Sequence, residues 1–125
     1  EPLIKTNTER YGSSKRHFFV LDIVNQPLPQ VDLIVCRDCM QHLVNQDVKK
    51  LIANIKKSKS KYLLANSYMT SQENYDLDNI YATTRLSYRN LLIPPFSLPT
   101  PLVTINEGFE NKALMLWKIE DLPDL

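Results

Sequence analysis

The sequence predicts an α/β fold built on a mostly parallel sheet that ends in an antiparallel pair of strands. Two near-continuous apolar runs, Phe18–Ile23 and Val31–Cys36, precede an amphipathic helical stretch, and two further apolar segments flank a turn near the C-terminus. Apolar runs of this length are typical of strands that are buried on both faces of a parallel sheet. A chain of 125 residues is large enough for one such domain.

The first part of the chain is expected to hold one short helix and two strands. Pro2 suits the first turn of a helix over residues 2–11, because its missing N–H costs nothing there, and Gly12 is a stop signal. The strands are expected at Arg16–Ile23 and Val31–Cys36, with a proline-rich turn between them.

An amphipathic helix is expected after the second strand. Apolar residues recur there at helical spacing and form one stripe, which consists of Val44, Val48, Leu51, Ile52 and Ile55. Asn45 is placed to cap this helix, and lysines near its end favour the helix dipole. A third strand is expected at Lys61–Tyr68.

The rest of the chain combines a long irregular segment with a hairpin. Met69–Pro101 has little regular pattern, which is usual for an insertion or a functional lid, and its aromatic and proline residues favour an ordered loop. Leu102–Asn106 and Ala113–Ile119 are expected to pair as antiparallel strands, because Gly108 and Asn111 indicate a turn between them. We therefore expect one domain over residues 1–125 that contains this insertion.

Polar side chains gather where the two predicted N-terminal strands end. Asp22 lies near the end of the first run, and the second run is followed by Arg37, Asp38 and, one turn later, His42. Ligands bind at the carboxyl ends of strands in open parallel sheets, so the sequence places a candidate site here. Asp22 has two interpretations: a carboxylate that accepts hydrogen bonds from a ligand, or a cap for the turn that follows it.

The sequence Cys-Arg-Asp-Cys at residues 36–39 also leaves two interpretations open. A C-x-x-C pair at a strand end is typical of redox sites, although Asp38 beside it opposes thiolate formation. Otherwise Cys36 is a buried strand residue and Cys39 packs at a turn. His42 adds a third potential metal ligand, whereas a structural zinc needs four, so no metal is predicted.

Composition and charge argue against several classes of function. The formal net charge of +1 gives no signal for nucleic-acid binding, and no apolar run is long enough to cross a bilayer. Two cysteines do not make a secreted disulfide framework, so we expect a reducing, cytoplasmic setting. The presence of only two glycines and a first residue other than Met leads us to expect a longer parent protein.

Several segments occur in an order that characterises a known family. FFVLDI is followed by PLPQVDLIVCRD, then by His42-Leu43, an amphipathic helix, KYLLANSY and a final strand pair. This ordered set resembles the C-terminal portion of a class I S-adenosylmethionine-dependent methyltransferase, which has a Rossmann-like fold. It is most similar to uncharacterised methyltransferase-like proteins that carry "CRDC…HL" and "PPF-LP-PL" patterns. The chain is thus expected to be a partial methyltransferase domain.

The resemblance implies S-adenosylmethionine as the cofactor and assigns roles to particular residues. Asp22 and its neighbour Ile23 would hold the adenine, and Cys36, Arg37 and Asp38 would line the methionine side. The catalytic base would be His42, and the substrate-side candidates are Tyr88, Arg85, Arg89 and Glu107. The methyl acceptor is left unknown, either a small molecule or a protein.

The resemblance further implies the sheet order 3-2-1-4-5-7-6, with FFVLDI as the third strand. The family's Gly-rich turn and the acidic residue that binds the ribose are absent from this sequence. We therefore expect one of three arrangements: a longer parent protein, direct pairing of FFVLDI with VDLIV, or a second chain that fills the gap. The chain is expected to be inactive if the Gly-rich turn is essential.

Two other functions remain open on the sequence. A non-catalytic Rossmann-like domain would act through protein contacts, including a homo-oligomer formed through an exposed sheet edge. A C-x-x-C redox protein would use Cys36 and Cys39.

Overall fold

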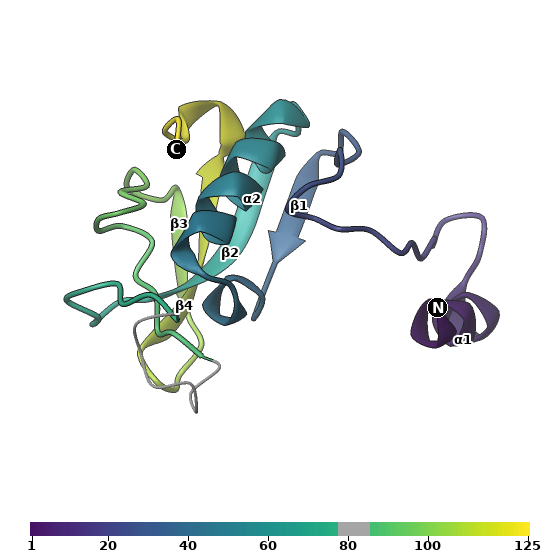
Figure 1. The fold of residues 1–125 in the computed structure, drawn as a ribbon, viewed down its shortest axis with the longest axis horizontal. Helices are drawn as coiled ribbons and strands as arrows, with labels where there is room; N and C mark the ends of the chain where they lie inside the picture. The colour runs from purple at the N-terminus through teal and green to yellow at the C-terminus, as the bar shows by residue number, and fades with distance from the viewer. Residues whose placement is uncertain (78–85) are drawn as a thin grey trace.

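One mixed sheet organises the chain in the computed structural model, which describes residues 1–77 and 86–125. Within these ranges it has four strands, which lie side by side in the order β1-β2-β4-β3 (Figure 1). β1 pairs with β2 in parallel, and the β2–β4 and β3–β4 pairs are antiparallel. The strands are β1 (Leu33–Cys36), β2 (Tyr62–Tyr68), β3 (Val103–Asn106) and β4 (Lys112–Lys118).

The expectation of a mostly parallel, Rossmann-like sheet is wrong, because only the β1–β2 pair is parallel among the described strands. The run Phe18–Ile23 forms no strand, and Phe19 and Val20 are 72% and 65% exposed. A strand needs a neighbour that takes its backbone hydrogen bonds. No described backbone bond links this run to β1, so direct pairing of the two apolar runs is also wrong.

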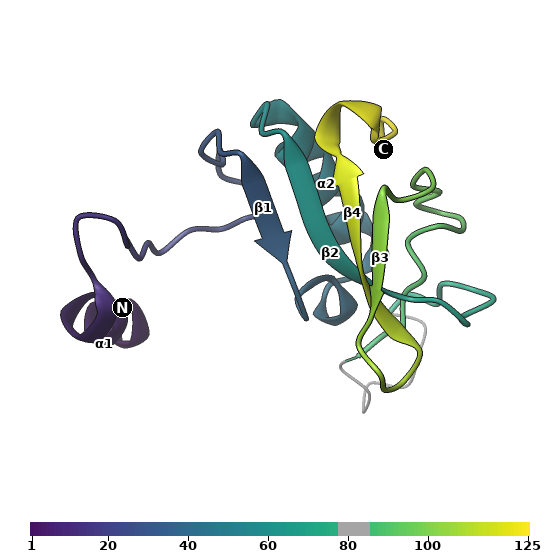
Figure 2. The same cartoon turned by 180° about the vertical axis from the view of Figure 1, so that it is seen from behind.

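Both predicted helices are present. α1 (Pro2–Tyr11) ends at Gly12, has no buried residue and lies apart from the sheet in both views (Figures 1 and 2). α2 (Asn45–Lys57) packs on one face of the sheet. None of the described helices is both long and apolar enough to cross a membrane.

The start of α2 differs from the sequence prediction. The N-cap is Val44, whose side chain makes no capping bond, and Asn45 is the first helical residue. A carboxylate from the loop takes the capping role, because the backbone N–H of Asn45 donates to Asp76 Oδ1 at 3.1 Å. A negative charge is favourable at a helix N-terminus.

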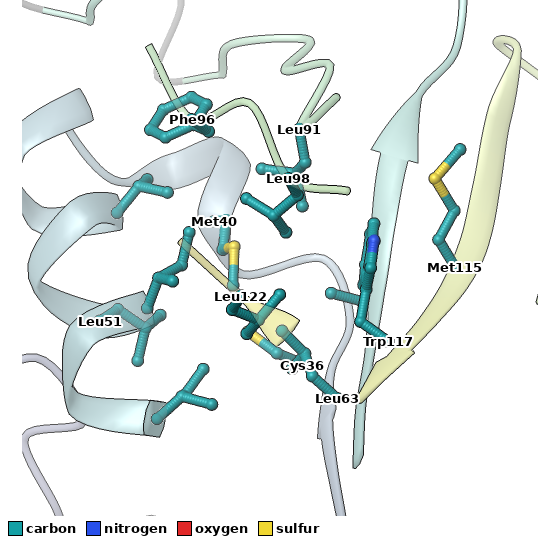
Figure 3. Packing of buried hydrophobic residues seen from close by; sticks show 14 of the residues in the cluster. Cys36, Met40, Leu51, Leu63, Leu91, Phe96, Leu98, Met115, Trp117 and Leu122 are labelled. Atoms are coloured by element: carbon teal, nitrogen blue, oxygen red, sulfur yellow. The ribbon is translucent and has the colours of Figure 1, made fainter. Parts of the chain in front are cut away.

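The hydrophobic core lies between α2 and one face of the sheet (Figure 3). α2 contributes the predicted stripe, of which Val48, Leu51, Ile52 and Ile55 are buried. The described part of the predicted insertion also enters the core, since Leu91, Phe96 and Leu98 are at most 4% exposed. Trp117 Nε1 donates to the Pro99 carbonyl at 2.7 Å and ties this segment to β4. The described part of the segment is therefore packed into the domain.

The opposite face of the sheet carries apolar side chains, and no described helix lies over it (Figure 2). One row crosses all four strands in register: Val35, Leu64, Leu116 and Val103. Val35 is 60% exposed and Val103 is 47% exposed. The apolar runs predicted strands that are buried on both faces, whereas on the face opposite α2 the described residues leave the ends of this row exposed.

This difference between the faces predicts unequal costs of truncation. Leu63→Ala removes a fully buried side chain beneath α2 and should lower the free energy of unfolding by about 2–5 kcal/mol in urea denaturation. Leu33→Ala, on the uncovered face and 45% exposed, is the matched control and should cost less than about 1 kcal/mol. Equal losses would show that the second face is also covered in solution.

Candidate functional site

Charged and amide side chains meet at the carboxyl ends of β1 and β2. We call this set the polar cluster; it consists of Arg37, Asp38, Gln41, Asn66, Glu107 and Lys112. The turn after β1 supplies Arg37 and Asp38, and the short 3-10 helix η1 (Met40–His42) supplies Gln41. β2, the β3–β4 turn and β4 supply the others. The carboxyl ends of the two parallel strands lie at the same edge of the sheet, which is where the sequence placed a candidate site.

Arg37 reaches across the end of the sheet to Glu107. Its Nε and NH2 atoms both donate to Glu107 Oε1, at 2.9 and 2.7 Å. Hydrogen bonding to Glu107, and then its charge, raise the pKa of Arg37. The Glu107 side chain is only 9% exposed. Its Oε2 atom is buried without a hydrogen-bond partner and lies 3.8 Å from the charged Lys112 Nζ. A buried acceptor without a donor is costly, so this oxygen is suited to a donor from a ligand.

Asp38 and Lys112 form the second ion pair of the polar cluster. Lys112 Nζ lies 2.9 Å from Asp38 Oδ1, and the Lys112 side chain is 5% exposed. The hydrogen bond from Lys112, followed by one from Gln41 at 3.2 Å, lowers the pKa of Asp38 below its ordinary value. Asp38 has a positive φ of 52°. Its carboxylate is therefore charged at neutral pH and held at a fixed position.

The Asn66 side chain joins the ends of the two parallel strands. Its Oδ1 accepts from the backbone N–H of Asp38 at 2.7 Å, and its Nδ2 donates to Gln41 Oε1 at 3.0 Å. Asn66 and Gln41 are both 6% exposed. These buried bonds fix the turn after β1, which carries the charged residues.

Cys36 and Cys39 are both reduced, and their thiols hydrogen-bond to each other. Cys36 is buried at the end of β1, and the hydrogen bond and burial raise its pKa strongly. The same bond, assisted by the nearby His42, lowers the pKa of Cys39 to about 7. The more reactive thiol of the pair is therefore Cys39, which is partly exposed.

The adenine-side candidates lie on the loop before β1. The Asp22 carboxylate accepts from the backbone N–H groups of Val24 and Asn25 and from Asn25 Nδ2, at 3.0, 3.2 and 2.9 Å. These bonds correspond to the turn-capping interpretation, and they lower the pKa of this exposed carboxyl. Ile23 lines an apolar hollow of about 200 Å³ together with Cys36. Ile23 and Cys36 are thus brought together, whereas the Asp22 carboxylate serves its own turn.

The substrate-side candidates occupy different positions. Arg89 is 2% exposed and bonds inward to the Met40 and Leu43 carbonyls and to Asn45 Oδ1. It therefore connects η1 with the start of α2. Tyr88 is 48% exposed and lies beside the end of β2.

His42 and Arg85 complete the set of candidates. His42 ends η1 and is exposed, and its charge helps to lower the pKa of Cys39. Arg85 lies outside the described residues. Of the predicted residues, the structure thus brings Arg37, Asp38 and Glu107 into one cluster.

Sequence reasoning assigned no role to Gln41, Lys112 or Asp76. Gln41 and Lys112 are both buried and bond to Asp38, and Asp76 caps α2. Lys112 gave one signal, because a lysine next to a strand that is buried on one face calls for a charged partner. Gln41 and Asp76 gave none.

The chain was compared with models of protein families, with curated proteins and with solved structures, and none of the three comparisons found a match. Proposals about its function therefore rest on the geometry and on the sequence resemblance.

The thiol pair predicts a specific pH dependence. Alkylation of Cys39 by iodoacetamide should reach half its maximal rate near pH 7, because only the thiolate reacts, and the rate should fall as the pH is lowered. Cys36→Ala removes the bond that stabilises this thiolate, so the midpoint should rise toward the ordinary value of 9.0. Mass spectrometry of the labelled peptide gives the rate. An unchanged midpoint in the variant would contradict the assigned cause.

Proposed function

We propose that this chain forms part of an S-adenosylmethionine-dependent methyltransferase, with the polar cluster beside the cofactor. The observation that carries the proposal is the strand order β1-β2-β4-β3 with its single parallel pair among the described strands. The sequence resemblance implies the order 4-5-7-6 for the family's last four strands, and β1-β2-β4-β3 is the same order if β1 is the fourth strand. Arg37 and Asp38 then follow the strand whose end would line the methionine side.

The charged residues suit the ends of the cofactor's amino-acid portion. The Arg37 side chain is 48% exposed and can pair with a carboxylate, and the Asp38 side chain is 36% exposed and can pair with an ammonium group. The apolar hollow beside Ile23 and Cys36, at about 200 Å³, is below the usual range for a whole ligand and suits one ring. When bound, the cofactor supplies an electrophilic methyl carbon on a sulfonium.

The protein's own part in such a reaction is mostly positioning. Arg37, Asp38 and Lys112 are tied to one another and to Glu107, so their charges are preorganised. Glu107 Oε2 is the buried acceptor that an N–H or O–H group of the methyl acceptor would satisfy. His42 is exposed at the end of η1 and remains the candidate base.

The second candidate is an interaction domain whose partner is a second copy of this chain. The free edge of β1 and the uncovered row through Val35 and Val103 support it, because exposed apolar patches and open sheet edges are typical of contact surfaces. The exposed apolar run Phe18–Ile23 forms no strand in this chain, and it is a segment that a second copy could pair with β1. The redox alternative is favoured only by the low pKa of Cys39.

Calorimetric titration with S-adenosylhomocysteine tests the first candidate. The chain should bind it, and Arg37→Ala should weaken binding about tenfold or more through loss of a charged hydrogen bond. Arg10→Ala, in the detached helix α1, is the matched control and should bind as the wild type does. Absence of binding to the folded chain, or equal binding by Arg37→Ala, would contradict the proposal.

Light scattering on the same samples separates the second candidate. A dimer that Val35→Lys converts to a monomer, with no heat from S-adenosylhomocysteine, would favour the interaction domain. A monomer that binds S-adenosylhomocysteine would exclude it.

A further inference from the structure

A hollow of about 310 Å³ lies beyond the end of β2, next to the polar cluster. It is lined by Tyr68, Thr70, Ser71, Tyr88 and Glu110. A second hollow of about 480 Å³ shares Ser71 and Tyr88 with it and extends along the loop. We call the first one the tyrosine hollow.

Two aromatic rings form one wall of the tyrosine hollow. The Tyr68 and Tyr88 rings pack edge to face, with centroids 4.8 Å apart and planes at 78°. Tyr68 is 3% exposed, and its backbone N–H donates to the Arg89 carbonyl at 2.8 Å. Ser71 Oγ donates to the Tyr88 carbonyl at 2.6 Å. Bonds from both flanking segments therefore hold the ring pair, while the half-exposed Tyr88 leaves ring surface open.

The charge around the hollow is negative. Asp38 and Glu107 are matched by Lys112 and Arg37, whereas Glu110 has no lysine or arginine partner within the described ranges. Glu110 sits in the β3–β4 turn and lines the hollow directly. Burial, followed by the charges of Glu110 and Asp38, raises the pKa of Tyr68 to about 12. An anionic ligand is therefore disfavoured here.

Aromatic rings beside one carboxylate match a particular class of ligand. A cation over the face of a tyrosine is attracted by the ring, and alkylated ammonium groups combine this attraction with an apolar surface and weak hydration. Lys112 already uses the same chemistry nearby, since its Nζ lies 4.5 Å from the centroid of Phe109. A purely apolar ligand would leave Glu110 without a role.

We propose that the tyrosine hollow binds an alkylated ammonium group, with Tyr68 and Tyr88 as its aromatic wall and Glu110 as its counter-charge. The inference goes beyond the methyltransferase proposal, because ammonium binding needs neither the cofactor nor methyl transfer. It assigns a role to Tyr88, whose hydroxyl is then less important than its ring.

The test compares choline with 3,3-dimethylbutan-1-ol, the neutral molecule of the same shape, in titrations followed by NMR. Choline should bind saturably at millimolar concentration and about fivefold or more tightly than the alcohol, because only choline carries the charge. This comparison uses the wild-type chain and needs no variant. Equal binding of the two molecules, or no choline binding up to about 50 mM, would overturn the proposal.

Three variants locate the binding. Tyr88→Leu should weaken choline binding about fivefold and Tyr88→Phe less than about twofold, because phenylalanine keeps the ring. Glu110→Gln should weaken choline binding without changing that of the alcohol, and the exposed Glu120→Gln is its matched control. Choline binding that survives both Tyr88→Leu and Glu110→Gln would place the ligand elsewhere and refute the assignment. Titration with S-adenosylhomocysteine is a separate experiment, so either proposal can fail alone.

Discussion

β2 is the element on which the rest of the structure depends, because it pairs in parallel with β1 on one edge and antiparallel with β4 on the other. Its register with β1 brings Cys36 beside Ala65, and its register with β4 brings Tyr68 beside Lys112. The same strand buries Leu63 and Ala65 beneath α2. The hydrophobic core, the polar cluster and the tyrosine hollow are therefore all positioned by one strand, the last two at its carboxyl end.

The sheet is covered unevenly, and this shapes any account of function. The face beneath α2 has a closed core, whereas the opposite face shows an apolar row from Val35 to Val103 that no described helix covers. At the carboxyl ends of β1 and β2 the same face changes to buried polar residues such as Asn66 of β2 and Lys112 at the start of β4. A bare apolar surface next to preorganised charges is typical of a protein that completes its site with a further element or partner.

Local pattern predicted much of the fold, and long-range pairing was where it failed. The residues of the apolar stripe of α2 lie within a few positions of one another, and so do the turn residues Gly108 and Asn111. Such local patterns can be recognised in the sequence. A strand at Phe18–Ile23 required a neighbour, which no local pattern can supply. The ion pairs Arg37–Glu107 and Asp38–Lys112 join residues 70 and 74 positions apart, so they became visible only once the strand order was known.

Amide hydrogen exchange tests the central claim most directly, namely that β2 is the most stable strand and that the sheet ends at β1. The amides of β2 should exchange slowest, and those of Phe18–Leu21 should exchange as fast as an unprotected peptide, because none of the described backbone bonds holds them. The measurement should be made at two protein concentrations. Protection of Phe18–Leu21 that equals that of β2 would contradict the account and place a strand beside β1.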